Sequence, residues 1–170
     1  MPNLASQNPR SNSVASELRR KRGLLRIRRI AKLTAFVRAL RRSHGADRVP
    51  DFDPTEAGTN ARILILLEAP GPRATKARGG SGFVSADNND GTAENLWHLL
   101  REAGIDRTRE IVTWNVVPWY IGTAQRIRAA SSKDIVAGRQ HMEDLRRLLP
   151  RVRVVVLLGR SATKSWKKLE

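Results

Sequence analysis

Two carboxylates occupy positions from which they could hold a water molecule or a substrate. Glu68 follows the apolar run of residues 63–67, and Asp87 lies in the stretch GSGFVSADNND. A carboxylate of this kind can orient a water or a substrate. Simpler roles exist for both regions. Glu68 could pair with one of the many arginines, and the nearby Asp90, which could itself hold a water, could instead cap the next helix, as could Thr92.

Other residues have the chemistry to recognise a flat ring. Asn115 ends the apolar stretch IVTWN, and its amide offers one acceptor and two donors, which suits the edge of a pyrimidine. Phe83 is an aromatic residue in a small, polar loop, where it could stack on a base. The turn of Ala69, Pro70 and Gly71 is stiffened by proline and offers backbone N–H groups. Alternatively, Asn115 closes a turn and Phe83 packs in the core.

The elements that would position these residues alternate along the chain. Short apolar runs predict buried strands, and the segments between them predict amphipathic helices. The predicted strands are residues 63–67, 111–117 and 152–158, and the predicted helices are residues 92–103 and 131–149, with a short basic helix after the last strand. This order predicts an α/β fold with three layers, in which helices cover both faces of a central, mostly parallel sheet of three to four strands (α/β/α). In such sheets, ligands bind beyond the carboxyl ends of the strands.

Helix-ending signals support these boundaries. Gly104 is placed to follow the last turn of the first helix, where glycine is favoured. Ser131 and Asp134 have the spacing of a capping box at the start of the second helix, and Pro150 bars its continuation.

The chain is divided by composition into three parts. Residues 1–15 are polar and aperiodic and predict a disordered tail. Residues 16–60 predict a basic helix, ending near Arg42, and a linker, and residues 61–170 form the α/β domain. The basic helix carries one apolar stripe, formed by Ile30, Leu33, Val37 and Leu40. Its arginines could lie along phosphates or could simply face solvent.

Charge is the strongest feature of the composition. The chain holds 32 Lys and Arg against 16 Asp and Glu, and 13 of the basic residues lie in residues 1–50 with only two acidic ones. This excess favours a polyanionic partner such as nucleic acid. The absence of cysteine excludes disulfides, thiolate zinc sites and a cysteine-bound iron–sulfur cluster. No apolar run has the length of a membrane span, and we expect a cytoplasmic, nucleoid-associated monomer.

Taken in order, these segments resemble the uracil-DNA glycosylase superfamily over roughly residues 60–165. The resemblance lies in LLEAPGP, in GSGFVSADNN with its phenylalanine, in WNVVPW with its asparagine, and in VVVLLGRSA. Each motif is short, but their order and their placement at successive strand ends are specific.

The resemblance implies a base excision repair enzyme that flips a damaged base out of DNA and hydrolyses its N-glycosidic bond. Phe83 would stack on the flipped uracil and Asn115 would read its edge, beside the turn of Ala69, Pro70 and Gly71. Asp87, or else Glu68, would position the water. The resemblance implies no metal and no organic cofactor.

The sequence departs from the family pattern in two places. Leu67 stands where the resembled loop has glycine. The chain also ends soon after the last strand, without the histidine-bearing loop of the family, which predicts a domain incomplete at its C-terminus. The alternative function is therefore a non-catalytic DNA-binding remnant of the same fold. A nucleotide-binding protein that uses loop 71–82 is a weaker possibility, because no phosphate-binding signature is complete.

Overall fold

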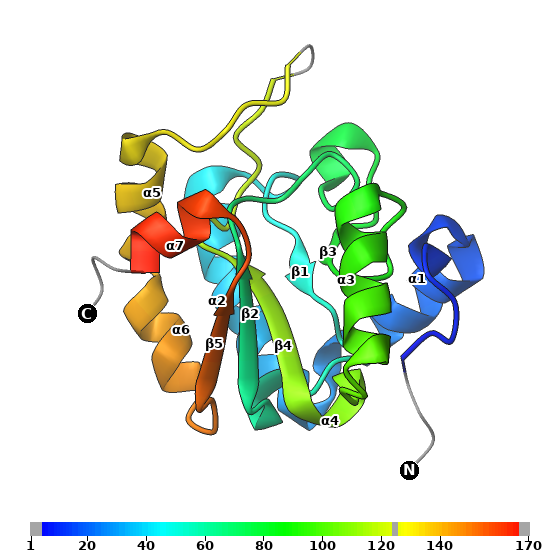
Figure 1. Cartoon of the computed structure of the whole chain (residues 1–170). Coiled ribbons are helices and arrows are strands. Elements are labelled where there is room, and N and C mark those ends of the chain that lie inside the picture. The colour runs from blue at the N-terminus through cyan, green and yellow to red at the C-terminus, as the bar shows by residue number, and fades with distance from the viewer. Residues whose placement is uncertain (1–4, 124–125, 167–170) are drawn as a thin grey trace.

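The computed structural model describes residues 5–123 and 126–166, and its centre is a parallel sheet of three strands. The strands are β2 (Ile63–Leu67), β4 (Ile111–Asn115) and β5 (Val154–Leu157), arranged in the order β4-β2-β5 (Figure 1). Two further short strands, β1 (Asp51–Phe52) and β3 (Phe83–Val84), pair in parallel beside it. The three long strands lie within the three predicted apolar runs. β2 and β4 are largely buried, whereas β5 is an edge strand in which Val154 and Val156 are exposed.

The helices that surround the sheet alternate with these strands. In chain order they are α1 (Ala15–Gly23), α2 (Arg28–His44), α3 (Gly91–Glu102), α4 (Arg107–Glu110), α5 (Ser132–Arg139), α6 (Met142–Leu148) and α7 (Arg160–Trp166). Short 3₁₀ turns occur at Ser11–Ser13, Leu24–Arg26, Gly58–Asn60 and Lys76–Arg78.

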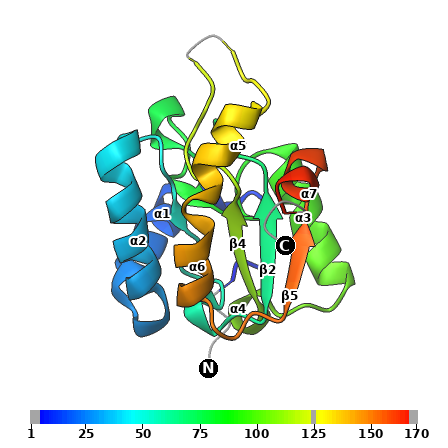
Figure 2. The same ribbon diagram turned by 90° about the vertical axis from the view of Figure 1, so that its left-hand side faces the viewer.

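Alternate residues of the strands face opposite helical layers. Leu64 and Leu66 belong to the larger apolar cluster, which includes residues of α2 and α6, whereas Ile65 and Ile111 pack with α3. Figure 2 shows α2 and α6 on one side of the sheet and α3 on the other. The predicted α/β fold, with helical layers on both faces and a helical N-terminus, is therefore confirmed.

The structure contains the predicted glycine after α3 and the predicted capping box of α5, but the helix predicted at residues 131–149 is interrupted. Gly104 has φ +67° immediately after the C-cap of α3, and the Ser131–Asp134 capping box opens α5. The predicted helix 131–149 is divided into α5 and α6. Gly138 lies against the Val116 carbonyl, where a Cβ would come within 2.2 Å, and glycine weakens a helix by about 1 kcal/mol. The helix breaks just after this contact.

The N-terminal segment is packed against the domain over much of its length. The predicted basic helix is two helices, α1 and α2, separated at Ile27, which has extended backbone. The predicted apolar stripe is buried on α2, and residues 49–58, expected as a linker, are buried as well. Within the tail expected at residues 1–15, Asn12 is also buried, while residues 1–4 lie outside the described part.

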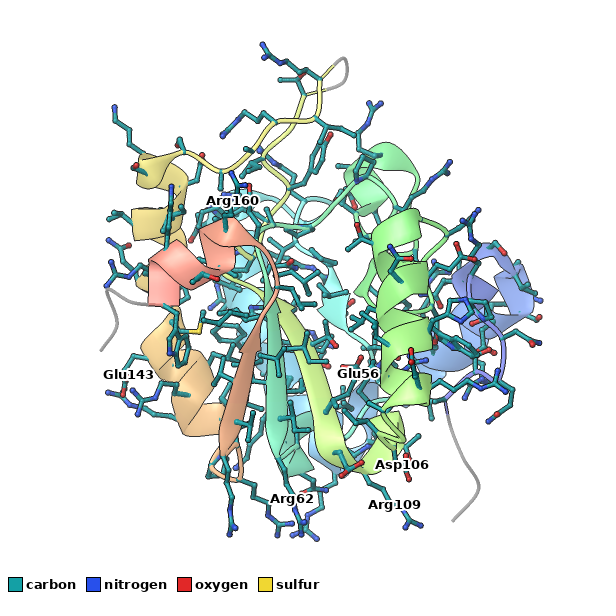
Figure 3. The ribbon with its side chains drawn as sticks, in the orientation of Figure 1. Glu56, Arg62, Asp106, Arg109, Glu143 and Arg160 are labelled. Atoms are coloured by element: carbon teal, nitrogen blue, oxygen red, sulfur yellow. The ribbon has the colours of Figure 1, made fainter. Side chains whose placement is uncertain are left out.

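The exposed basic residues are spread over both ends of the sheet. Figure 3 shows Arg62 and Arg109 near the amino ends of the strands and Arg160 near the carboxyl end, with Glu56 in the interior beside β4. Among the described residues, no helix combines the length and the apolar character that crossing a membrane requires.

Candidate active site

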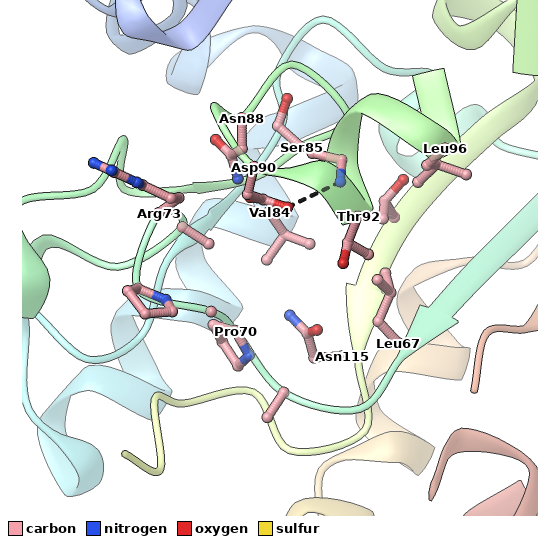
Figure 4. A pocket seen from close by; sticks show the side chains of 16 residues that line it. Leu67, Pro70, Arg73, Val84, Ser85, Asn88, Asp90, Thr92, Leu96 and Asn115 are labelled. Atoms are coloured by element: carbon pink, nitrogen blue, oxygen red, sulfur yellow. Dashed lines mark hydrogen bonds between the residues drawn. The ribbon is translucent and has the colours of Figure 1, made fainter. Parts of the chain in front are cut away.

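A cavity of about 300 Å³ opens at the carboxyl ends of β2 and β4. Figure 4 shows the side chains around it. The lining residues come from the end of β2 and the loop after it, from β3 and the segment after it, from the start of α3, and from β4: Leu67, Ala69, Pro70, Gly71, Pro72, Arg73, Ala74, Val84, Ser85, Asn88, Asp90, Thr92, Ala93, Leu96, Thr113 and Asn115.

The sheet register explains why these segments meet. Leu67 and Asn115 are paired in the β2–β4 ladder and are the last residues of their strands. Thr113 and Asn115 lie on the same face of β4 because strand side chains alternate, and this is the face that α3 covers. The position agrees with the general location of ligand sites in parallel α/β sheets.

The loop after β2 is held in a fixed shape at the rim of the cavity. The N–H of Gly80 donates to the carbonyl of Thr75 at 2.8 Å, and the N–H of Ser81 donates to that of Arg73 at 2.9 Å. A Cβ on Gly80 would lie 2.5 Å from the Pro72 carbonyl, so this close return needs glycine. The loop is therefore a shaped wall.

Asn115 supplies an unpaired donor to the cavity. The residue is 2% exposed, and its amide nitrogen Nδ2 has no hydrogen-bond partner within the described part of the chain. Figure 4 shows the amide pointing into the space between Pro70, Val84 and Leu67. A buried donor without a partner costs about 1–3 kcal/mol, which a ligand acceptor would recover.

Asp90 places a carboxylate on the wall opposite the end of β2. One oxygen, Oδ1, accepts from the N–H of Ala93 at 3.0 Å and caps α3 (Figure 4). Among the described residues that line the cavity, only Asp90 carries a carboxylate. It is partly exposed, and its second oxygen remains available for a water or a substrate.

The structure brings four of the seven predicted site residues to the cavity wall, namely Ala69, Pro70, Gly71 and Asn115. Glu68 is not among the lining residues; its carboxylate accepts from the N–H of Ala130. Phe83 is 1% exposed and is not in the lining either, whereas the adjacent Val84 is. The stacking role of Phe83 stays a prediction, and the wall at this position is aliphatic.

Asp87 lies behind the wall in a buried cluster of ion pairs. Lys21 Nζ is 2.7 Å from Asp87 Oδ2 and 2.7 Å from Asp53 Oδ2. Arg107 Nη1 donates to Asp87 Oδ1 at 2.8 Å. Both oxygens of Asp87 are therefore engaged by cations, and its side chain is 0% exposed. Its predicted role in holding water stays a prediction.

The charges of this cluster stabilise one another. Burial alone raises the pKa of Asp53, but the charges of Lys21 and Arg107 outweigh burial and hold that pKa well below its usual range. Burial lowers the pKa of Arg107, but the hydrogen bond and the charge of Asp87 raise it above its usual value. Two carboxylates and two cations give a neutral cluster, which is the arrangement that a buried site tolerates.

Glu56 links this cluster to the cavity. Its carboxylate accepts from the N–H of Thr113 at 2.7 Å and from the hydroxyl of Thr113 at 2.8 Å. Burial, together with the negative charge of Asp53, raises the pKa of Glu56 to about 8. Glu56 caps the free edge of β4, and Thr113 in turn lines the cavity.

Sequence reasoning did not find this buried cluster. Lys21 looks like one more cation in an arginine-rich helix, and only its tertiary neighbours distinguish it. Asp53 and Arg107 lie in segments without a recognisable motif. The position of Asp90 could be recognised in the sequence, because aspartate is favoured at the N-cap just before a helix. The start of this helix, α3, lies at the edge of the cavity.

The comparison with protein families identifies the class. A family model described as the Uracil DNA glycosylase superfamily matches residues 54–169, which is more than half of the chain. The chain therefore belongs to the uracil-DNA glycosylase superfamily, as its motifs indicated, and carries a DNA glycosylase-like fold. The family is one of glycosylase hydrolases with DNA as substrate. A comparison with curated proteins found no match.

Proposed function

We propose that this protein binds DNA, receives a flipped uracil or a similar damaged base in the cavity, and hydrolyses its N-glycosidic bond. The observation that carries the proposal is the unpaired amide donor of Asn115 inside a cavity that also bears the carboxylate of Asp90. A flipped base presents carbonyl oxygens, which can accept from Asn115. The aliphatic side chains of Val84, Leu67 and Leu96 can cover the faces of the ring.

The reaction needs a water placed near C1′ of the deoxyribose. The C1′–N bond breaks with its electron pair leaving on the base, and the water oxygen bonds to the oxocarbenium-like C1′. The carboxylate of Asp90 stabilises the positive sugar and accepts the proton of the water. The base leaves as an anion, which is protonated in solution. We favour Asp90 for this role because Glu68 and Asp87 are engaged away from the cavity.

Release of uracil from a uracil-containing oligonucleotide tests the proposal. Asp90→Asn keeps a side-chain oxygen for the helix cap but removes the charge, so uracil release should fall about 10²–10⁴-fold. The matched control is Asp144→Asn, at an exposed aspartate of α6, which should release uracil at the wild-type rate. Wild-type-like activity of Asp90→Asn would exclude this carboxylate as the group that activates water.

The rim of the cavity supports a DNA contact. Arg73 lines the cavity and is exposed, and Arg78 is exposed on the same loop. If each contacts a phosphate, Arg73→Ala with Arg78→Ala should reduce the slope of log affinity against log salt by about 1.8. The control is Arg62→Ala, at the opposite end of the sheet, and an equal change in slope there would show that the protein does not bind DNA through this rim.

The alternative of a non-catalytic DNA-binding protein predicts a different result. A wild-type protein that binds the oligonucleotide with a steep salt dependence, but releases no uracil, would favour it. In that case Asp90→Asn would leave the affinity for the oligonucleotide nearly unchanged, and neither protein would release uracil.

A further inference from the structure

The segment before residue 54 lies outside the family match, yet it supplies a cation to the centre of the domain. Lys21 belongs to α1, and its ammonium is fully buried between Asp53 and Asp87. Without Lys21, two buried carboxylates would share the single charge of Arg107. A buried cluster with an unpaired charge is strongly unfavourable. The family-matched region thus depends on a residue that precedes it.

Lys21 is connected directly to the wall of the cavity. Its Nζ also donates to Ser85 Oγ at 3.3 Å, and Ser85 lines the cavity. The hydroxyl of Ser85 donates to Asp53 Oδ2, and it accepts from the N–H of Asp87 at 3.0 Å. The backbone of this wall is therefore tied to the side chains that Lys21 holds together.

A second contact from the same N-terminal segment reaches the next wall residue. Asn12 Nδ2 donates to Asn88 Oδ1 at 2.9 Å, and the N–H of Asn12 donates to the carbonyl of Asp87 at 2.9 Å. Ser81 Oγ also donates to Asn88 Oδ1, at 2.7 Å. Asn88 lines the cavity, so its orientation is set partly by a residue 76 positions earlier.

We propose that Lys21 is a positioning residue of the active site: acting through Ser85 and Asp87, it holds the wall segment 84–88 in the geometry that receives the base. The N-terminal segment is thus part of the glycosylase site. This inference rests on the function proposed above. Its physical basis is that the ammonium of Lys21 contacts Asp53, Asp87 and Ser85 inside the domain, whereas Arg22, next to it on α1, is exposed.

The first test measures the wall itself and needs no enzymatic activity. Lys21→Met removes the charge with similar length, and Lys21→Met combined with Asp53→Asn leaves Arg107 paired with Asp87, so that the buried cluster is again neutral. Amide hydrogen exchange at Asp87 and Asn88 should become at least about tenfold faster relative to the β2–β4 ladder in both variants. Arg22→Met, at the adjacent exposed position of α1, is the control and should leave the amide exchange rates of Asp87 and Asn88 unchanged.

The second test separates positioning from stability. If Lys21 only stabilised the fold, its loss would lower the amount of active protein and hence the apparent kcat, with KM unchanged. A displaced wall instead raises KM, and we expect a rise of about 10- to 100-fold for a uracil-containing oligonucleotide in the charge-balanced double variant. A wild-type KM in that variant would overturn the inference.

The two proposals fail in different ways. If the wild type releases no uracil but wall exchange accelerates in the Lys21 variants, the glycosylase function fails and the positioning of the wall by Lys21 stands. If uracil is released but exchange at Asp87 and Asn88 follows that of the sheet, the positioning role of Lys21 is wrong.

Discussion

Two polar regions of this molecule lie back to back and differ in how their groups are satisfied. In the cluster of Lys21, Asp53, Asp87 and Arg107, each charged side chain has an oppositely charged neighbour, and all are at least 93% buried. Nε and Nη2 of Arg107 have no hydrogen-bond partner among the described residues, but its charge is balanced by Asp87 and Asp53. In the cavity, the amide nitrogen of Asn115 has no hydrogen-bond partner among the residues that the structure describes. Balanced buried charges hold a structure, whereas an unpaired donor at the wall of a cavity can bind the acceptor of a ligand. We therefore assign the cluster to the scaffold and Asn115 to the proposed site.

The largest expected effect comes from unbalancing the cluster. Asp87→Asn keeps the shape of the side chain but leaves an excess positive charge in the interior, so the free energy of unfolding should fall by about 3–5 kcal/mol. Urea unfolding measures this loss. Asp144→Asn removes an aspartate from an exposed ion pair and should change stability by less than about 0.5 kcal/mol. Similar losses in both variants would mean that the cluster is not a structural unit.

Asn115→Ala should affect activity strongly and stability little. Stability should change little, because the lost amide nitrogen forms no hydrogen bond with any described residue. The value of kcat/KM for uracil release should fall about 100-fold, since the base loses its hydrogen bond in the cavity. Gln140→Ala removes an exposed amide and serves as the control. A strongly destabilised Asn115→Ala protein with normal kcat/KM would reverse the assignment of this residue.

Glu56 lies between the ionic cluster and the cavity, and its raised pKa should make the free energy of unfolding depend on pH. Folding raises its pKa from 4.5 to about 8, so the folded protein keeps a proton that the unfolded chain loses above about pH 4.5. Unfolding therefore releases a proton between these values, and stability falls as pH rises, by up to about 1.4 kcal/mol per unit from this group.

Glu56→Gln removes this contribution. Urea unfolding at pH 5.5, 6.5 and 7.5 should show stability that declines less with pH in Glu56→Gln than in the wild type. Glu143→Gln, at an exposed position of α6, should retain the wild-type slope. Parallel pH profiles for wild type and Glu56→Gln would show that Glu56 is already ionised in the folded protein at neutral pH.

The smallest expected effect concerns the cap formed by Asp90. Asp90→Ala removes the acceptor for the Ala93 N–H and should cost about 1 kcal/mol of stability, whereas Asp90→Asn should cost only a few tenths. Chemical denaturation of the two variants measures the difference. An asparagine variant as unstable as the alanine variant would indicate that the charge of Asp90, and not its cap, supports the fold.

Much of the fold could be predicted because its strands are continuous apolar runs. Residues 63–67 form β2 as expected, and the place of Asn115 at the carboxyl end of β4 followed from the parallel arrangement. Phe83 illustrates what the sequence does not show. Phe83 and Val84 form the two-residue strand β3, and neighbouring side chains of a strand point to opposite faces. A shift of one residue therefore decides which side chain faces the cavity, and here it is Val84.

The ionic cluster was beyond sequence reasoning for a related reason. Nothing local distinguishes Lys21 from Arg20 or Arg22, and its burial depends on Asp53 and Asp87, which are far away in the chain. Pattern methods detect periodic burial of apolar residues, but a single buried cation produces no period.

The separation of these partners bears on how the chain folds as it is synthesised. Lys21 is 66 residues before Asp87, and Asp87 is 20 residues before Arg107. Helix α1 leaves the ribosome early, but the ammonium of Lys21 gains its last carboxylate partner only when Asp87 has emerged, and the cluster is complete only when Arg107 has followed. Long-range contacts of this kind form slowly. The neutral cluster that buries Lys21 is therefore complete only after more than 100 residues have been made.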